Sequence, residues 1–316
     1  MSADTKAVPD SITAAARAGL YGTPAADVLA RPADAIQFSP LMPGASELEA
    51  QREATLASMT MLAPPGTLER RYTMALALRA VKPGGAIAAA APKDHGGTRL
   101  RKELQAFGCT VEDVARRHHR IVTGVRPANL TGIEDALRDG APRIVEGLGL
   151  WSQPGVFSWD RIDAGTALLL EHLPSLSGRG ADFGCGIGIL AAAVLSSKKV
   201  ERITLIDIDR RAVACAQHNI DDARATFHWA DLRDPLPELT ELDFVVMNAP
   251  FHDAGHEDRG LPHHFVRRAA EALRKGGVCW LTANRHLPYE AVMKPLFRHV
   301  ELKIEAAGYK IYEMRK

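Results

Sequence analysis

The fold is decided by the stretch DFGCGIGIL at residues 182–190. It ends a short apolar segment at 180–183 and leads into an apolar segment at 188–196, which is the pattern of a strand, a tight turn and a helix. Gly184, Gly186 and Gly188 let the backbone come close to a ligand. The spacing is GxGxG, and Ile189 occupies the last glycine position of the dinucleotide fingerprint GxGxxG, so the turn disfavours an NAD site.

Segments on both sides of this turn alternate between strand and helix patterns. Apolar strands are predicted at 202–206, 225–229, 242–247 and 277–282, and helices at 164–172, 210–219 and 265–273. This alternation predicts a doubly wound α/β sheet that begins near Trp151.

The first half of the chain is also α/β, but it has no glycine turn of this kind. Helices are predicted at 68–81 and 100–107, and strands at 86–90 and 120–123. Residues 77–87 (ALRAVKPGGAI) resemble residues 272–279 (ALRKGGVC), since each is a helix end, a Gly-Gly turn and a strand. Chance can produce this agreement, but if the halves share a fold, only the second is equipped for a cofactor. Residues 1–60 are expected to form an irregular or short-helical lead-in without chemistry.

Two acidic residues stand at the ends of later strands. Asp207 closes the next predicted strand, where a carboxylate can accept hydrogen bonds from both hydroxyls of a ribose, and Asp231 follows the third, where it can meet an adenine amino group. The turn holds no Lys or Arg, so a nucleoside cofactor without phosphates is indicated. S-adenosylmethionine is such a cofactor, and Asp182 is the candidate partner of its ammonium group. Taken singly, the glycines can form an ordinary turn and Asp207 can cap a helix.

The tetrapeptide Asn248-Ala249-Pro250-Phe251 closes the fourth strand, at the sheet edge where α/β proteins bind ligands. The amide oxygen of Asn248 and the carbonyl of Ala249 can accept the two N–H groups of a planar exocyclic amine. Phe251 can stack on the ring, and Pro250 fixes the backbone. This arrangement aims the nitrogen lone pair at a sulfonium methyl group, so positioning does most of the catalysis and no strong base is needed. By itself, such a tetrapeptide is also typical of a turn.

Histidines follow the tetrapeptide, beginning with His252, which we assign to a polar active-site loop. His256, His263 and His264 lie nearby, but they include no helical i, i+4 pair with an aligned acid. The four cysteines are far apart and form no CxxC pair. We therefore expect no metal site.

Composition sets the broad class and compartment. The 316 residues contain 39 Lys and Arg against 38 Asp and Glu, and the net charge of +1 gives no overall attraction to nucleic acid or membrane. Spread, unpaired cysteines are typical of a reducing compartment. With neither a signal sequence nor a run of about 18 apolar residues, a cytoplasmic protein without a membrane partner is expected.

One local patch is basic. Between Lys93 and Arg126, eight Lys or Arg, among them Arg99 and Arg101, stand against four acidic residues. A solvated helix face and a contact with an RNA backbone both fit this charge. The patch lies in the half of the chain that lacks the glycine turn.

Several motifs, in order, resemble ribosomal RNA small subunit methyltransferase C, within the class I S-adenosylmethionine-dependent methyltransferases. They are Pro154-Gly155-Val156-Phe157-Ser158, Asp163-x-Gly165-Thr166, DFGCGIGIL, Asn-x-Pro-Phe-His-Asp from residue 248, and Thr282-Ala283-Asn284. The resemblance runs from about residue 151 to 316 and is weaker over residues 67–126.

The resemblance implies methylation of guanine N2 in ribosomal RNA, in 16S rather than 23S rRNA. It implies an α/β fold of two tandem Rossmann-like methyltransferase domains: a degenerate, substrate-binding one at 61–135 and a catalytic one at 150–316 with a doubly wound seven-stranded sheet. Ribosomal RNA or the small ribosomal subunit is the expected partner of a monomer. The residues assigned are Asp182, Gly184, Gly186, Gly188, Asp207 and Asp231 for the cofactor; Asn248, Pro250 and Phe251 for catalysis; and Ala249, His252, Lys93, Arg99 and Arg101 for the substrate.

The family usually has Asn-Pro-Pro-Phe, and in this chain Ala249 takes the place of the first proline. Alanine keeps the backbone carbonyl that can accept a hydrogen bond, but it makes the backbone less rigid. Other functions remain open. The amine could belong to a protein glutamine, to adenine N6 or to a small molecule. From a different class, the chain could be a non-catalytic RNA-binding or ribosome assembly factor.

Overall fold

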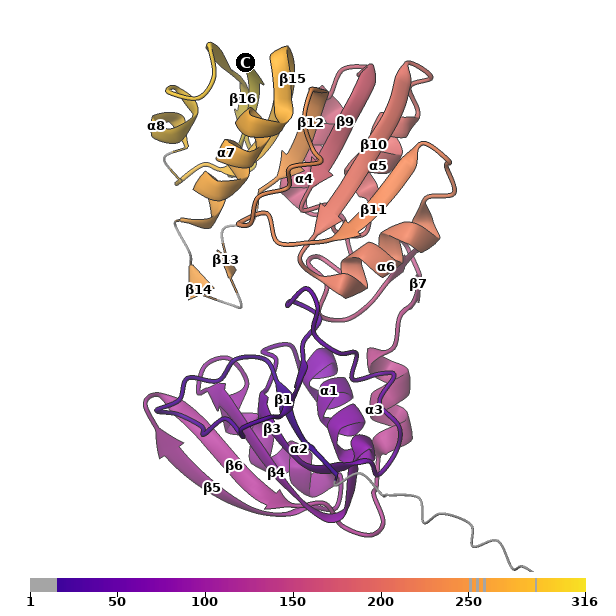
Figure 1. Ribbon diagram of the computed structural model, residues 1–316, viewed down its shortest axis with the longest axis vertical. Coiled ribbons are helices and arrows are strands. Elements are labelled where there is room, and N and C mark those ends of the chain that lie inside the picture. The colour runs from indigo at the N-terminus through magenta and orange to yellow at the C-terminus, as the bar shows by residue number, and fades with distance from the viewer. Residues whose placement is uncertain (1–15, 250–251, 254–255, 258–259, 288) are drawn as a thin grey trace, which may run out of the picture.

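The computed structural model describes residues 16–249, 252–253, 256–257, 260–287 and 289–316, which form two α/β lobes (Figure 1). The N-terminal lobe, from β1 to α3, has a mixed sheet of six strands, and the C-terminal lobe, from α4 to β17, has one of seven. The expected fold class, with two tandem sheets of which the second has seven strands, is confirmed. Two small sheets also lie in the described part of the chain: β7 (Arg143–Val145) with β8 (Leu150–Ser152), and β13 (His252–Asp253) with β14 (His256–Glu257).

The N-terminal sheet has the order β2-β1-β3-β4-β6-β5, with the first four strands parallel and β6 antiparallel to both of its neighbours. Its strands are β1 (Ala18–Tyr21), β2 (Ile36–Phe38), β3 (Leu56–Leu62), β4 (Val81–Pro92), β5 (Thr110–Arg116) and β6 (His119–Val125). The helices of this lobe are α1 (Thr67–Ala80), η1 (Gly97–Arg99), α2 (Leu100–Ala106) and α3 (Ile133–Gly140).

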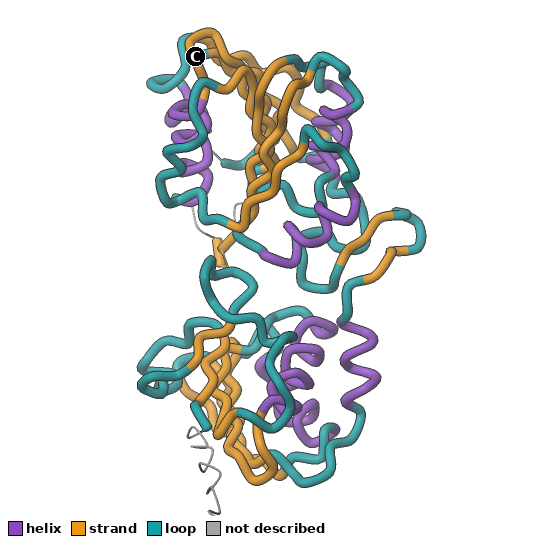
Figure 2. The backbone as a smooth tube through the Cα atoms, turned by 45° about the vertical axis from the view of Figure 1, so that its right-hand side comes forward, coloured by secondary structure: helices purple, strands orange, loops and turns teal. Residues whose placement is uncertain are grey.

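Helices cover one face of this sheet, as Figure 2 shows. Met74 and Leu78 of α1 and Leu104 of α2 belong to the apolar cluster on that side. On the other face, Val28 from the loop after β1 packs against Ala90 of β4, in a much smaller cluster. The predicted helices 68–81 and 100–107 and strands 86–90 and 120–123 fall on α1, α2, β4 and β6.

The lead-in differs from the irregular or short-helical structure expected of residues 1–60. β1, β2 and the first part of β3 lie in it, and β1 is paired on both sides within the sheet. These strands are not recognised from the sequence because β1 has four residues and β2 has three. Strands this short, in a parallel sheet, show neither a long apolar run nor alternation. The domain boundaries at 61–135 and 150–316 remain a prediction.

The C-terminal sheet has the order β11-β10-β9-β12-β15-β17-β16, parallel except for β17, which is antiparallel to β15 and β16. Its strands are β9 (Gly178–Phe183), β10 (Val200–Asp207), β11 (Ala225–Trp229), β12 (Leu242–Asn248), β15 (Leu273–Asn284), β16 (His299–Ala306) and β17 (Tyr309–Arg315). Its helices are α4 (Ala164–His172), α5 (Ile189–Leu195), α6 (Arg210–Asn219), α7 (Leu261–Ala272) and α8 (Glu290–Met293).

Both faces of this sheet are covered, which confirms the doubly wound prediction. Leu169 of α4, Leu190 of α5 and Ala216 of α6 pack on one face, in a cluster with Leu205 and Val246. On the opposite face, α7 and α8 pack against Val245 and Met247 of β12, in a second cluster. The sheet is therefore buried between helices, and its carboxyl edge is the place for a ligand.

The two sheets share one topology. The order β2-β1-β3-β4-β6-β5 matches β10-β9-β12-β15-β17-β16, and the N-terminal sheet lacks a counterpart of the edge strand β11. The repeat at residues 77–87 and 272–279 falls at equivalent places, where α1 leads into β4 and α7 leads into β15.

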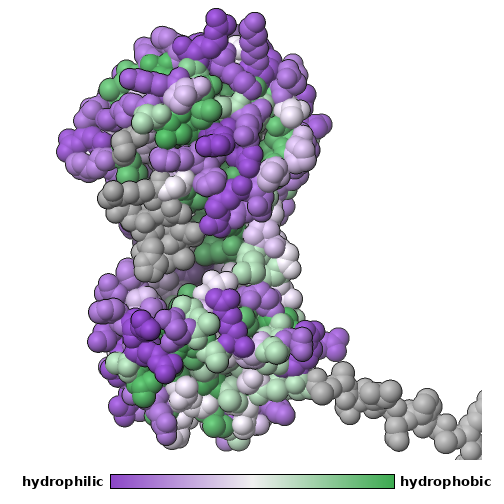
Figure 3. Space-filling view, turned by 60° about the vertical axis from the view of Figure 1, so that its left-hand side comes forward, coloured by the Kyte–Doolittle hydropathy of each residue, from purple (hydrophilic) through white to green (hydrophobic). Residues whose placement is uncertain are grey.

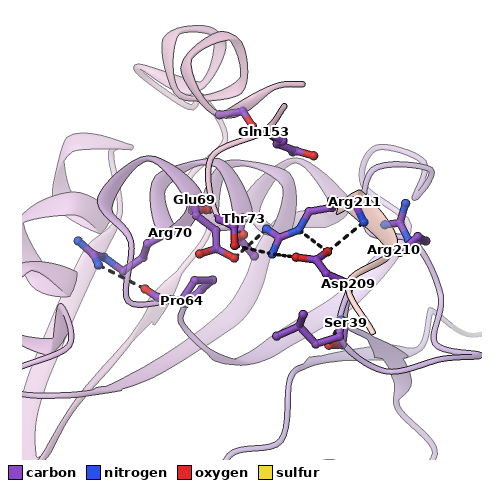
Figure 4. A network of polar contacts seen from close by, with 12 residues as sticks. Ser39, Pro64, Glu69, Arg70, Thr73, Gln153, Asp209, Arg210 and Arg211 are labelled. Atoms are coloured by element: carbon purple, nitrogen blue, oxygen red, sulfur yellow. Dashed lines mark hydrogen bonds and ion pairs between the residues drawn. The ribbon is translucent and has the colours of Figure 1, made fainter. Parts of the chain in front are cut away.

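The lobes meet at the carboxyl edges of their sheets. Figure 3 shows a narrower waist between them. Arg211, in the first turn of α6, donates from Nη1 to Oε1 of Glu69, in the first turn of α1, at 2.7 Å, and Figure 4 shows this pair from close by. Arg210 donates from Nη2 to Oε2 of Glu49 at 2.9 Å and from its backbone N–H to the carbonyl of Pro40, also at 2.9 Å. These contacts between the lobes thus come from the first turn of α6, close after Asp207.

Candidate active site

The glycine turn after β9 requires its glycines. Gly184, Gly186 and Gly188 have φ values of +71°, +52° and +90°, a region that side chains with a Cβ rarely adopt. A Cβ on Gly188 would lie 2.8 Å from Cδ1 of Ile220, so this glycine also lets the start of α5 pack closely against the end of α6. A Cβ on Gly186 would meet nothing within 4 Å, which leaves open space beside the turn at that point.

Asp182 anchors the turn from inside the sheet. Its carboxylate is fully buried, and Oδ2 accepts a hydrogen bond from the backbone N–H of Ala191 at 3.1 Å. The other oxygen, Oδ1, has no hydrogen-bond partner among the described residues. Burial raises the pKa of Asp182 to about 8, and the nearby Asp207 carboxylate also acts to raise it. An unpaired, buried carboxyl oxygen is costly, so this position favours a donor or a cation from a ligand.

Asp207 joins the glycine turn to the next loop. At the end of β10, its Oδ2 accepts from the backbone N–H of Gly186 and its Oδ1 from that of Asp209, both at 2.8 Å. Burial raises the pKa of Asp207 to about 6. Each oxygen retains a second lone pair, so the carboxylate can still accept from the two hydroxyls of a ribose.

Asp231, just beyond β11, is already paired. Its oxygens accept from the backbone N–H and Nε of Arg233 at 2.8–3.0 Å. Although burial opposes it, these bonds and the charge of Arg233 hold the pKa of Asp231 below its ordinary value. The carboxylate is therefore ionised at neutral pH, with part of its acceptor capacity in use.

Asn248 is the last residue of β12, and the nitrogen of its side-chain amide is hydrogen-bonded. Nδ2 donates to Oδ2 of Asp163 and to Oγ1 of Thr166, both at 2.9 Å. Ala249 is buried in the cluster with Met247, so only its backbone could contact a substrate. Pro250 and Phe251 lie outside the described residues, and so does the side chain of His252, whose backbone forms part of β13.

The strand order brings the predicted cofactor and catalytic residues to one edge. Asp231, Asp207, Asp182 and Asn248 stand at the ends of β11, β10, β9 and β12, which are neighbours in the sheet in that order. Lys93, Arg99 and Arg101 lie elsewhere, exposed near the carboxyl end of β4 in the N-terminal lobe. The backbone N–H of Lys93 donates to the carbonyl of His118 in the turn between β5 and β6, which joins that turn to the same patch.

Comparison with known proteins gives the family. Residues 147–313 match the family model "Methyltransferase small domain". Ribosomal RNA small subunit methyltransferase C of Pseudomonas paraeruginosa is 31% identical over 313 residues, which is 94% of each chain. The protein of the same name from Shewanella loihica is 31% identical over 253 residues, 78% of this chain and 73% of that one.

The chain belongs to the ribosomal RNA small subunit methyltransferase C family.

A further relative with this name, from Pseudomonas entomophila, is 35% identical over 223 residues, 67% of this chain and 65% of the relative. Among solved structures, the T. thermophilus 16S rRNA N2 methyltransferase in complex with AdoMet and guanosine has a TM-score of 0.71 at 23% identity, covering 86% of this chain and 76% of that chain. At that identity, the likeness establishes the shared fold. The predicted family and its class of enzyme, a methyltransferase, are confirmed.

The residues present fit the methyl donor of such a methyltransferase. The unpaired Oδ1 of Asp182 and the open space at Gly186 suit the methionine part of S-adenosylmethionine, and Asp207 suits its ribose. Within the described residues, no group of three or more His, Cys, Asp or Glu could hold a metal ion, and none of their helices is long and apolar enough to cross a membrane. All four cysteines are buried and free.

Sequence analysis missed the residues that hold Asn248. Asp163 caps α4, since its Oδ2 also accepts from the backbone N–H groups of Gly165 at 2.9 Å and Thr166 at 3.1 Å. Tyr309 of β17 donates to Oδ1 of Asp163 at 3.3 Å. The segment Asp163-x-Gly165-Thr166 is one of the family motifs, but nothing in its spacing indicates a contact with Asn248.

Proposed function

We propose that this chain transfers a methyl group from S-adenosylmethionine to the exocyclic N2 of a guanine in 16S ribosomal RNA. The observation that carries the proposal is the orientation of the Asn248 amide at the carboxyl end of β12, beside the turn of Asp182 and Asp207. With Nδ2 engaged by Asp163 and Thr166, Oδ1 is presented as an acceptor. Family membership supports the substrate class.

The reaction needs an acceptor pair more than a base. In the proposed complex, Oδ1 of Asn248 and the carbonyl of Ala249 accept the two N–H groups of the guanine amine. When bound, S-adenosylmethionine supplies an electrophilic methyl group on a sulfonium. The N2 lone pair forms the new N–C bond as the C–S bond breaks, which leaves a neutral thioether and a cationic nitrogen. That nitrogen then releases one proton to solvent, so precise positioning supplies most of the rate.

We place the RNA backbone on the basic patch of the N-terminal lobe. Lys93, Arg99 and Arg101 are exposed and form no ion pair within the described residues, so their charges are available to phosphates. A guanine in a helix would have to leave its stack, or come from an unpaired loop, to reach Asn248. We propose 16S rRNA or the small subunit as the partner, and we propose that a cytoplasmic monomer binds it.

Transfer of label tests this function directly. Unmodified 16S rRNA and small subunits are incubated with methyl-labelled S-adenosylmethionine, and the nucleosides are identified by mass spectrometry. The expected product is N2-methylguanosine. Binding of the cofactor without any labelled nucleoside would overturn the RNA substrate, and label on protein or on adenine N6 would replace it with one of the other amines.

A further inference from the structure

The catalytic amide of Asn248 has two possible orientations that differ only by exchanging its nitrogen and oxygen. The neighbours decide between them. Oδ2 of Asp163 lies 2.9 Å from the terminal amide atom, and it already accepts from two backbone N–H groups, so it is an acceptor at this position. The NH2 group must therefore face Asp163, because the reverse orientation would place oxygen against oxygen.

Thr166 cannot make this choice. Its Oγ1 is 2.9 Å from Nδ2 of Asn248, but a hydroxyl can donate as well as accept and would tolerate either orientation. Asp163 is thus the residue that determines which amide atom is turned away from α4. No hydrogen-bond partner of Oδ1 of Asn248 is found in the described part of the chain, so this oxygen is left for a donor from outside.

Asp163 is itself held firmly. Two backbone N–H groups at the start of α4 donate to its Oδ2. Oγ1 of Thr282 donates to the carbonyl of Gly165 at 2.9 Å, and Thr282 is the register partner of Asn248 in the adjacent strand. The start of α4 and the end of β12 are therefore fixed to the same strand, β15.

Resting on the proposed function, we propose that Asp163 is a positioning residue, which orients the Asn248 amide so that its oxygen faces the target amine. Helix capping alone accounts for the bonds of Asp163 to Gly165 and Thr166, but not for its bond to Asn248. The two roles can be separated, because a shorter side chain can keep the cap while losing the reach to Asn248.

The decisive variant is Asp163→Ser, since serine is as good an N-cap as aspartate but its oxygen ends one bond earlier. We expect kcat to fall about 100-fold, the size of a loss of alignment at a reacting centre, while KM for S-adenosylmethionine stays within about twofold. Asp163→Asn is the matched control. Its amide oxygen can take the place of Oδ2, so most of the activity should be retained.

Thr166→Val should have a smaller effect than Asp163→Ser, because Thr166 does not choose the orientation. Combining Asp163→Ser with Asn248→Ala should add almost nothing to the loss from Asn248→Ala alone, as expected of residues that act as a unit. Thermal unfolding is measured for every variant. If Asp163→Ser is too unstable to assay, the comparison of Thr166→Val with Asp163→Asn and wild type carries the test.

Full activity of Asp163→Ser, or a loss in kcat that is accompanied by an equal loss of cofactor affinity and stability, would overturn the proposal. Failure of the proposed function would look different. Wild-type protein would then yield a product other than N2-methylguanosine, while the ratio of variant to wild-type rates on the true substrate would still report on Asp163.

Discussion

The two sheets of this chain have the same strand order but differ at their carboxyl edges. The two sheets can be aligned residue by residue at their Gly-Gly turns. In each sheet, one residue directly follows the Gly-Gly turn and is in register with a residue of the adjacent strand and with another of the strand beyond it. The residues in register are Ala86, Ser58 and Ala18 in the N-terminal sheet, and Val278, Phe244 and Gly180 in the C-terminal sheet.

Counting along the strands from these aligned positions gives, for each predicted cofactor or catalytic residue, a counterpart in the N-terminal sheet whose side chain differs in chemistry. The N-terminal counterparts of Asp182, Asp207 and Asn248 are Leu20, Ser39 and Leu62.

The backbone conformation at the start of the glycine turn is nevertheless the same in the two sheets. Gly22 has φ +67° where Gly184 has φ +71°, and each donates its N–H to a carbonyl of the next strand at 2.9 Å, Phe38 in one sheet and Ile206 in the other. The fold is therefore maintained by the apolar pattern and the glycine, whereas the three polar side chains to which we assign the chemistry occur in the C-terminal sheet alone.

The C-terminal lobe occupies the place where the N-terminal sheet would present a ligand. Arg211 reaches Glu69, and both side chains are buried. Tyr21 and Ser39, at the ends of β1 and β2, line a small cavity together with Arg210 and Arg211. Burial raises the pKa of Glu69 while Arg211 lowers it. This edge of the N-terminal sheet thus serves as a contact between lobes, and the residues near β4, which we propose for the substrate, lie outside that contact.

The largest effect on the methyl transfer rate is expected when Asn248 is replaced by the residue at the equivalent position of the N-terminal sheet. Asn248→Leu removes the acceptor of the target amine, and we expect kcat to fall about 10³-fold, as for the loss of one aligned polar group in a catalytic site. Cofactor affinity, measured by calorimetry, should be unchanged because the turn and Asp207 are untouched.

The reciprocal change, Leu62→Asn, is the control and should leave the rate as it is. An Asn248→Leu enzyme with more than about a tenth of wild-type kcat would contradict the role of this amide and the comparison built on it.

A smaller effect is expected at the ribose position. Asp207→Ser copies Ser39, and loss of charge-assisted hydrogen bonds should weaken binding of S-adenosylmethionine by about 10- to 100-fold. Burial raises the pKa of Asp207 to about 6, so wild-type affinity should fall as the pH falls through that value. The carboxylate then takes up a proton, and the protonated oxygen no longer accepts a hydrogen bond from the ribose as the charged form does.

Calorimetric titrations between pH 5 and 8 check both statements. The serine variant should lose the fall in affinity near pH 6 along with the affinity, and only the pH dependence due to Asp182, whose pKa is about 8, should remain. Asp222→Ser removes a carboxylate that accepts from the backbone N–H of Arg224, away from the glycine turn, and should change neither. Unaltered affinity of Asp207→Ser would refute the ribose assignment.

The sequence predicted those parts of the fold that depend on continuous local patterns. The helices expected at 164–172 and 210–219 and the strand expected at 225–229 have the observed bounds of α4, α6 and β11. β1 and β2 were missed because three or four residues carry too little pattern. The convergence of Asp182, Asp207 and Asn248 could be predicted because carboxyl ends of parallel strands share an edge.

Contacts between distant parts of the chain could not be predicted in this way. Asp163 is 85 residues from Asn248, and Glu69 is 142 residues from Arg211. Each pair depends on how helices are placed against strands of another segment, which no spacing in one sequence encodes. The assigned roles of Pro250, Phe251 and the His252 side chain stay predictions, since these lie outside the described part of the chain.

The smallest effect is expected for RNA binding by the N-terminal lobe, which we propose to bind the phosphates of the substrate. Changing Lys93, Arg99 and Arg101 together to alanine should weaken 16S rRNA binding about tenfold at moderate salt. It should also reduce the slope of log K against log salt by up to about 2, because each phosphate neutralised on single-stranded RNA contributes about 0.7 to that slope. Cofactor affinity should not change, because all three side chains are on the other lobe.

Lys198 and Lys199 supply the control for this change, since they are also exposed but precede β10 at the amino edge of the C-terminal sheet. Changing them to alanine removes two charges of the same kind, and filter binding at several salt concentrations should then give the wild-type slope. An equal loss of affinity in both sets of variants would mean that RNA is attracted by overall charge. The division between a binding lobe and a catalytic lobe would then fail.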